Sequence, residues 1–148
     1  MCCCRVIRIT ISCRGAKTRA DIEKLKKGGI GAVAFAVAVC RGPRTPEAFE
    51  AARKEADEKL AWIRAFVKDN AGSVELALTA ADIERIHKAG KVAVIESFLN
   101  ARSIGRDLNG IDEFYNWGVR LFGLVHGGKF ENGGLSELGK RAVARLNK

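Results

Sequence analysis

The sequence has little of what marks a non-globular chain. Only two of its 148 residues are proline and sixteen are glycine, while 47% are hydrophobic and 29% are charged. This composition excludes a collagen, a disordered polymer and a low-complexity tail. The length is typical of a single domain, and a chain of this size buries roughly two thirds of the surface that it exposes when unfolded.

Long apolar runs are also missing. The longest apolar stretch covers residues 30–40, whereas a membrane-spanning helix needs about 18 or more consecutive apolar residues. The opening residues MCCCRVIRIT lack the apolar region of a secretory signal. We therefore expect a cytoplasmic protein without a transmembrane segment.

The five cysteines do not form a recognisable framework. Cys2, Cys3 and Cys4 are adjacent, which gives poor geometry for bridges between them, and the other two are Cys13 and Cys40. Neither paired CxxC motifs nor histidines at zinc-finger spacing occur. Two interpretations stay open for the three adjacent cysteines, namely lipidation and an unstructured N-terminal segment.

A net charge of +9 suggests a nucleic-acid partner until the charges are located. Residues 1–28 contribute +6 and residues 132–148 contribute +3, whereas residues 29–131 sum to zero. A basic groove needs positive residues converging on one face, and the central aromatic residues lie at the spacing of a helical core instead. We expect no specific nucleic-acid binding. Electrostatic attachment of the N-terminal segment to RNA or anionic lipid is a weaker alternative.

One pattern occurs three times along the chain: a helical segment closed by glycine, then an apolar run typical of a strand. Capping boxes are expected at Thr18 with Asp21 and at Thr79 with Asp82, and Asn109 is expected to cap the third helix. The three copies are TRADIEKLKKGG before IGAVAFAVAVC, TAADIERIHKAG before KVAVIESF, and NGIDEFYNWG before VRLFGLVH.

Two further helices are predicted, one beginning after Thr45 and reaching about Lys68, the other starting at Ser136. Strands alternating with helices indicate an α/β fold with a parallel sheet and crossover helices. Residues 30–39 are apolar on both faces, as in a strand covered on both sides. Residues 74–78 and 6–11 are candidates for additional strands. Such a sheet is either small and open, or part of something larger whose edges are covered.

Three residues with ionisable side chains lie at the carboxyl ends of predicted strands: Cys40, Glu96 and His126. A carboxylate at the end of KVAVIE needs a positive partner, which is either a metal ion or basic substrate group, or an arginine such as Arg102 or Arg106. An exposed loop carboxylate is the third possibility. His126 is a candidate ligand, general acid/base or oxyanion donor, or else a surface residue in a glycine-rich turn.

Several segments together resemble the metal-dependent dipeptidases of the renal (membrane) dipeptidase type, peptidase family M19. The similarity covers about residues 18–147, and the order of its segments is distinctive. The segments are GGIGAVAFAVAV, RTPEAFEAARKEADEKLAWIRAF, ADIERIHKAGKVAVIES, IGRDLNGIDEFYNWGVRLFGLVH and NGGLSELGKRAVARLN.

The resemblance implies a (β/α)8 barrel with two zinc ions at the strand ends and hydrolysis of dipeptides by a metal-bound hydroxide. In this family one carboxylate bridges the metals, and Glu96 matches it. The histidine after the next strand lies near the substrate and the tetrahedral intermediate, and His126 matches that residue.

The chain also departs from the family pattern. Residues 1–17 contain no His and no Asp, so the opening His-x-Asp motif has no counterpart. The later histidine ligands would follow Lys148, and a closed barrel needs about 250 residues. We therefore expect a basic, cysteine-rich stub at 1–17 and a partial barrel at 18–148, which does not retain zinc and shows negligible peptidase activity by itself. The alternative is a non-catalytic α/β module that forms a homo-oligomer through open sheet edges.

Overall fold

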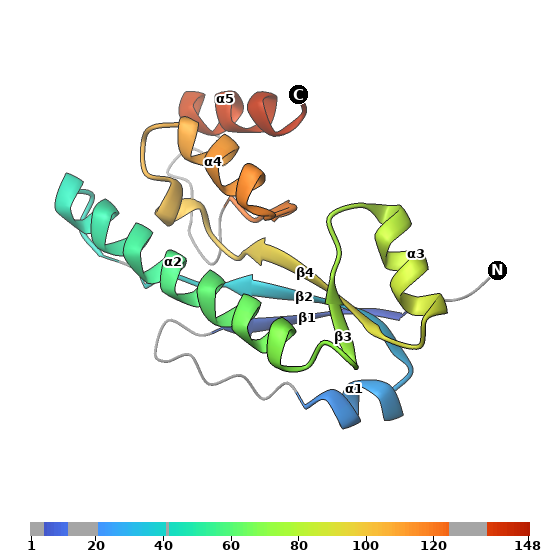
Figure 1. Cartoon of the computed structure of the whole chain (residues 1–148). Coiled ribbons are helices and arrows are strands. Elements are labelled where there is room, and N and C mark those ends of the chain that lie inside the picture. The colour runs from blue at the N-terminus through green and yellow to red at the C-terminus, as the bar shows by residue number, and fades with distance from the viewer. Residues whose placement is uncertain (1–4, 12–20, 41, 125–135) are drawn as a thin grey trace.

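The computed structural model describes residues 5–11, 21–40, 42–124 and 136–148 (Figure 1). Its strands are β1 (Arg5–Ile11), β2 (Ile30–Val37), β3 (Val74–Leu76), β4 (Val92–Phe98) and β5 (Leu121–Phe122). Its helices are α1 (Ile22–Lys27), α2 (Pro46–Asp69), α3 (Ala80–Lys88), α4 (Asn109–Trp117) and α5 (Glu137–Leu146), with a short 3₁₀ helix, η1 (Ala101–Ile104).

All strand pairs in the sheet are parallel, and the strand order is β1-β2-β4-β3, with β5 also paired to β4. The predicted α/β class is confirmed, and the arrangement is a partial (β/α)8 barrel. Both segments left open by the sequence, 6–11 and 74–78, contribute strands. The division expected at residue 17 stays a prediction, although β1 already belongs to the sheet.

Strands β3 and β5 lie end to end on the same side of β4. The amide of Ala77 donates to the carbonyl of Val94, and the amide of Arg120 donates to the carbonyl of Glu96. On the other side of β4, the amide of Leu99, just beyond the end of β4, donates to the carbonyl of Val37, the last residue of β2. Backbone groups alternate in direction along a strand, so the even-numbered residues of β4 pair with β3 and β5, while β2 occupies the opposite side.

The capping signals predicted at Thr45 and Thr79 are confirmed. Thr45 caps α2 ahead of Pro46, and Thr79 and Asp82 form a reciprocal capping box at the start of α3. The start of α1 was misassigned. Asp21 is itself the N-cap of α1, and Thr18 lies outside the described residues.

The start of α4 was also predicted one residue too far along the chain. Asn109 is the first helical residue, and the N-cap position falls on Leu108, which makes no side-chain capping bond. The Asp107 carboxylate accepts the amide of Asn109 at 3.0 Å and so supplies the cap from further upstream. The predicted helix start at Ser136 is confirmed.

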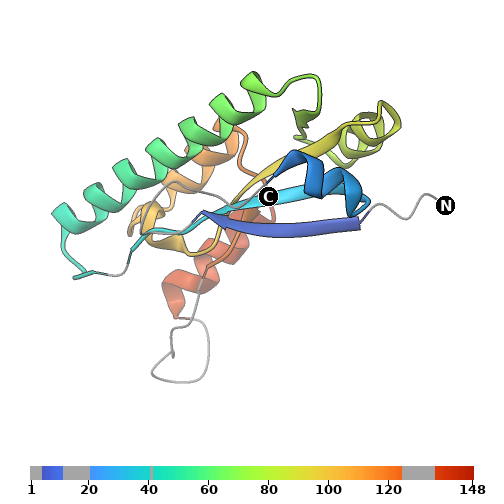
Figure 2. The ribbon, with the colours of Figure 1, turned by 90° about the horizontal axis from the view of Figure 1, so that it is seen from below.

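The two faces of the sheet carry different side chains. The first, here called the α2 face, carries Val33, Phe35 and Val37 of β2 and packs against α1 and α2 (Figure 2). The second, here called the alanine face, carries Ala32, Ala34 and Ala36 of β2 with Ala93, Ile95 and Ser97 of β4, and α3 packs against part of it through Ile86.

None of the helices in the described ranges is long and apolar enough to cross a membrane.

Candidate functional site

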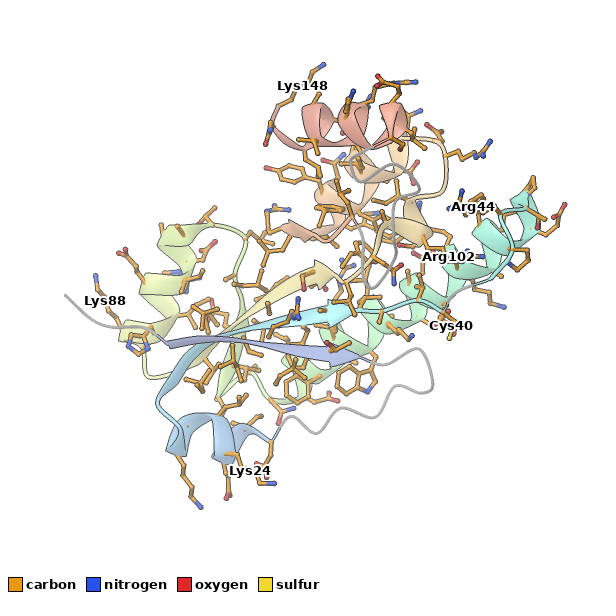
Figure 3. All side chains as sticks on the ribbon, turned by 180° about the vertical axis from the view of Figure 1, so that it is seen from behind. Lys24, Cys40, Arg44, Lys88, Arg102 and Lys148 are labelled. Carbon is orange, nitrogen blue, oxygen red and sulfur yellow. The ribbon has the colours of Figure 1, made fainter. Side chains whose placement is uncertain are left out.

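The carboxyl ends of β2 and β4 lie together at one end of the sheet, where sequence analysis placed the candidate residues. Cys40 follows β2 there, and Arg102 follows β4 at the same end (Figure 3). Glu96 lies within β4, two residues before its end. His126 lies outside the described residues.

Glu96 is fully buried and points into the α2 face. Its Cα is paired with that of Phe35, whose ring contacts Trp62 and Phe66 on α2, so Glu96 shares that side of the sheet. The exposed fraction of its side chain is 0%. A carboxylate in such a place requires a charged or hydrogen-bonding partner.

Arg64 of α2 supplies this partner. Its Nε donates to Glu96 Oε1 at 3.0 Å, and its Nη2 donates to Oε2 at 3.2 Å. This two-pronged arrangement matches the planar guanidinium to both oxygens of the carboxylate. Arg64 Nη2 also donates to the carbonyl of Trp117 at 2.5 Å, so one side chain joins α2, β4 and the end of α4.

Opposing effects act on the ionisation of this carboxyl. Burial raises the pKa of Glu96 above its ordinary value of 4.5, while Arg64 lowers it through hydrogen bonds and charge. Arg120 lowers it further by charge alone. The net direction is upward, because the removal of water outweighs the two cations.

An arginine partner was among the expectations for Glu96, but Arg102 and Arg106 do not fill that role. Arg102 instead donates to the carbonyls of Gly42 and Pro43, at 2.8 Å and 2.7 Å, and its guanidinium lies 5.5 Å from the ring of Phe49. It therefore ties η1 to the loop before α2. Arg106 is exposed. The reading of Glu96 as an exposed loop carboxylate is wrong as well.

A second charged group at this end of the sheet was missed by sequence analysis. Lys59 of α2 is only 6% exposed, and its Nζ donates to the carbonyl of Ala38 at 2.7 Å and to Glu55 Oε1 at 2.5 Å. The other oxygen of Glu55 accepts the amide of Cys40 at 3.3 Å. Lys59 and Glu55 thus bind the chain where it leaves β2. The signal for both was their i, i+4 spacing beside the apolar stripe of the helix.

The described residues do not fit a pair of zinc ions. Among them there is no group of three or more His, Cys, Asp or Glu side chains close enough to hold a metal. Zinc in proteins takes three or four protein ligands, and both oxygens of Glu96 already bind Arg64. We assign no catalytic step to a metal held by these residues.

Comparisons with known proteins bear on the same question. A model of the membrane dipeptidase family, peptidase family M19, matches residues 8–148. No curated protein sequence matches the chain significantly. Among solved structures, the probable dipeptidase PvdM from Pseudomonas aeruginosa is 27% identical with a TM-score of 0.81, and it aligns with 97% of this chain.

Two more solved structures are similar. Dipeptidase AC, a metallopeptidase of family M19, is 27% identical over 86% of this chain, with a TM-score of 0.73. A metallopeptidase from Rhodobacter sphaeroides, liganded with a phosphinate mimic of the dipeptide L-Ala-D-Ala, shares the fold at 21% identity, with a TM-score of 0.71 over 90% of this chain. The chain spans less than half the length of these proteins, at 44% of the first two and 48% of the third.

Proposed function

The chain belongs to the membrane dipeptidase family, peptidase family M19, and from that membership we propose that it is a partial dipeptidase-like barrel without hydrolytic activity of its own. Dipeptides are the proposed substrate class of the complete fold. One observation supports the proposed lack of hydrolytic activity. The described residues hold no group of three or more side chains that could bind a metal ion.

The residues of this chain cover only part of the family fold. An alignment with 97% of this chain accounts for only 44% of PvdM, so more than half of that structure has no counterpart here. The two zinc ions implied by the resemblance would need ligands that the described residues do not provide. Hydrolysis by a metal-bound hydroxide is thus proposed for the complete barrel and not for this chain.

The roles suggested for individual residues stay predictions. His126 is proposed to lie near the substrate and the tetrahedral intermediate when the barrel is complete. Glu96 as a bridging carboxylate requires that Arg64 leave both of its oxygens. A cytoplasmic location and the lack of a specific nucleic-acid partner likewise rest on the sequence.

An activity assay tests the proposal. Purified protein is incubated with zinc and the dipeptide Gly-D-Ala, and release of free amino acids is followed. We expect no turnover above that of buffer with zinc. Hydrolysis that disappears with a chelator and in His126→Ala would contradict the proposal. His87→Ala, which changes the other histidine of the chain, is the matched control.

Self-association is a second candidate function, favoured by the edges of the sheet. Within the described residues β1 pairs with β2 and no other strand, and β3 and β5 pair with β4 and no other strand. Strand edges with unpaired backbone groups favour pairing with another chain. We expect the mass measured by light scattering to increase with protein concentration. A single monomeric species at tens of micromolar would count against a homo-oligomer.

A further inference from the structure

We propose that Arg64, and not a metal ion, is the permanent counter-ion of Glu96, and that this pair fixes the turn between α4 and β5. The proposal does not depend on whether the chain hydrolyses dipeptides. It rests on the face to which Glu96 points, on the way its oxygens are occupied, and on the third segment that the arginine reaches.

The direction of the side chain is the first step. In a (β/α)8 barrel the helices surround the outside of the sheet, and catalytic groups converge inside the barrel at the carboxyl ends of the strands. Glu96 lies on the α2 face with Phe35, whereas its neighbours Ile95 and Ser97 lie on the alanine face. The carboxylate thus points toward a helix and away from the face that would line a barrel interior.

The second step is how closely the carboxylate is enclosed. Its oxygens hold Arg64 at 3.0 Å and 3.2 Å, and a Cβ atom placed on Gly118 would lie only 3.3 Å from Oε2. Gly118 has a φ of +120°, a conformation that other residues rarely adopt. The turn therefore needs glycine both for its backbone and for its approach to Glu96. A zinc ion at about 2.0 to 2.2 Å from these oxygens would have to displace the guanidinium.

The third step is the turn that the pair holds. Arg64 donates to the carbonyl of Trp117, and the backbone carbonyl of Glu96 accepts the amide of Arg120 at 3.0 Å. Residues on both sides of Gly118 are thus bound to the pair, one through the side chain and one through the main chain. Arg64 and Glu96 accordingly act as positioning residues for the start of β5.

Removing the arginine separates this role from metal binding. Arg64→Met keeps most of the side-chain volume but leaves a buried carboxylate without its partner, which is strongly destabilising. We expect the melting temperature to fall by about 5 to 10 °C, allowing for the partial exposure of Arg64. Arg106→Met is the matched control, because it makes the same change at an exposed arginine, and it should shift the melting temperature by about 1 °C or less.

Replacing both partners provides the decisive comparison. In Arg64→Met with Glu96→Leu no unpaired charge is left buried at this position, so we expect most of the lost thermal stability to return. Hydrogen exchange at the Arg120 amide should be faster in Arg64→Met than in the Arg106→Met control, because the turn is released. Should Arg64→Met fail to fold, recovery of folding in the double variant gives the same answer. Failure of the double variant to recover would contradict the proposal.

Zinc chloride is the probe for the competing explanation. With Arg64 as counter-ion, zinc leaves the melting temperature of the wild-type protein and of Glu96→Gln equally unaffected. A zinc-dependent rise in the wild type that is absent in Glu96→Gln would overturn the proposal. No dipeptide is present in these measurements, so their outcome is separate from the activity assay.

Discussion

The two faces of the sheet are built from different residues, and they differ in whether β2 and β4 supply a carboxylate. The α2 face buries large side chains such as Phe35 and Phe98 together with the carboxylate of Glu96, which pairs with Arg64. The alanine face buries mostly alanine, with Ile95, Ser97 and Leu99 toward the end of β4. The face corresponding to a barrel interior therefore supplies no carboxylate from β2 or β4.

The contrast also supports the structural role proposed for Glu96. A titratable residue at the end of a parallel strand is a candidate for function only if it faces the site. Glu96 lies near the carboxyl end of its strand, as a catalytic residue would, but its side chain is on the α2 face, where Arg64 of α2 binds it. Side chains alternate between the two faces along a strand, so a carboxylate one position earlier or later in β4 would lie on the other face.

The largest expected effect is on the α2 face. Phe35 is fully buried and contacts the rings of Trp62 and Phe66, at 6.2 Å and 5.5 Å between centroids. We expect Phe35→Ala to lower the free energy of unfolding by about 3 to 5 kcal/mol, measured by urea denaturation. A loss below about 1 kcal/mol would show that this face is not the main core.

An intermediate effect is expected from enlarging a residue on the alanine face. Ala93 is fully buried there, in the cluster that includes Ile86 of α3. Ala93→Leu adds volume between β4 and α3, and we expect a loss of about 1 to 3 kcal/mol in urea denaturation. A neutral or stabilising result would indicate unfilled space on this face. Ala61→Leu, at an exposed position of α2, is the control for the same substitution.

Smaller effects distinguish the helices that cover the two faces. Thr79 and Asp82 cap α3 reciprocally, and the Thr79 hydroxyl accepts the amide of Asp82 at 3.1 Å, whereas the Thr45 hydroxyl accepts the amide of Ala48 at the longer distance of 3.4 Å. We expect Thr79→Ala to cost about 1 kcal/mol and Thr45→Ala about 0.5 kcal/mol by urea denaturation. The reverse order would contradict the assignment of the stronger cap to α3.

The smallest effect is a pH dependence whose sign differs between Asp82, at the start of α3, and Glu96, on the α2 face. Hydrogen bonds from Thr79 and Arg85 lower the pKa of Asp82 below 3.8, so its stabilisation is present above pH 3.8 and is lost as the pH falls through the lowered value. Burial raises the pKa of Glu96, so its contribution is present below pH 4.5 and is lost as the pH rises through the raised value.

Urea denaturation of the wild type and of Asp82→Asn, carried out from about pH 6 down to about pH 2.5, on either side of the ordinary pKa of an aspartate, measures the first contribution. We expect the two proteins to differ at the upper end and to converge at the lower end. A difference that grows as the pH falls would contradict the direction assigned to Asp82.

Local signals predicted most of the fold. The starts of α2 and α3 follow from Thr45 and Thr79, and apolar runs identified β2 and β4, because caps and periodicity are encoded within a few neighbouring residues. The shared edge of β3 and β5 was not predicted. It depends on which side of β4 each segment reaches, and that choice is made by packing between distant parts of the chain.

The site was less predictable for the same reason. Arg64 and Glu96 are 32 positions apart, and neither belongs to a motif that names the other. Arg102 and Arg106 were the expected partners because they are near Glu96 along the chain. The available signal was that Arg64 follows Leu60 by one helical turn, at the margin of the stripe that packs on β4.

A crystal structure of the chain grown with excess zinc, with anomalous data collected at the zinc edge, tests the central claim most directly. We predict no anomalous peak at Glu96, with the Arg64 guanidinium on both carboxylate oxygens. A zinc peak bonded to Glu96, with Arg64 displaced, would contradict it.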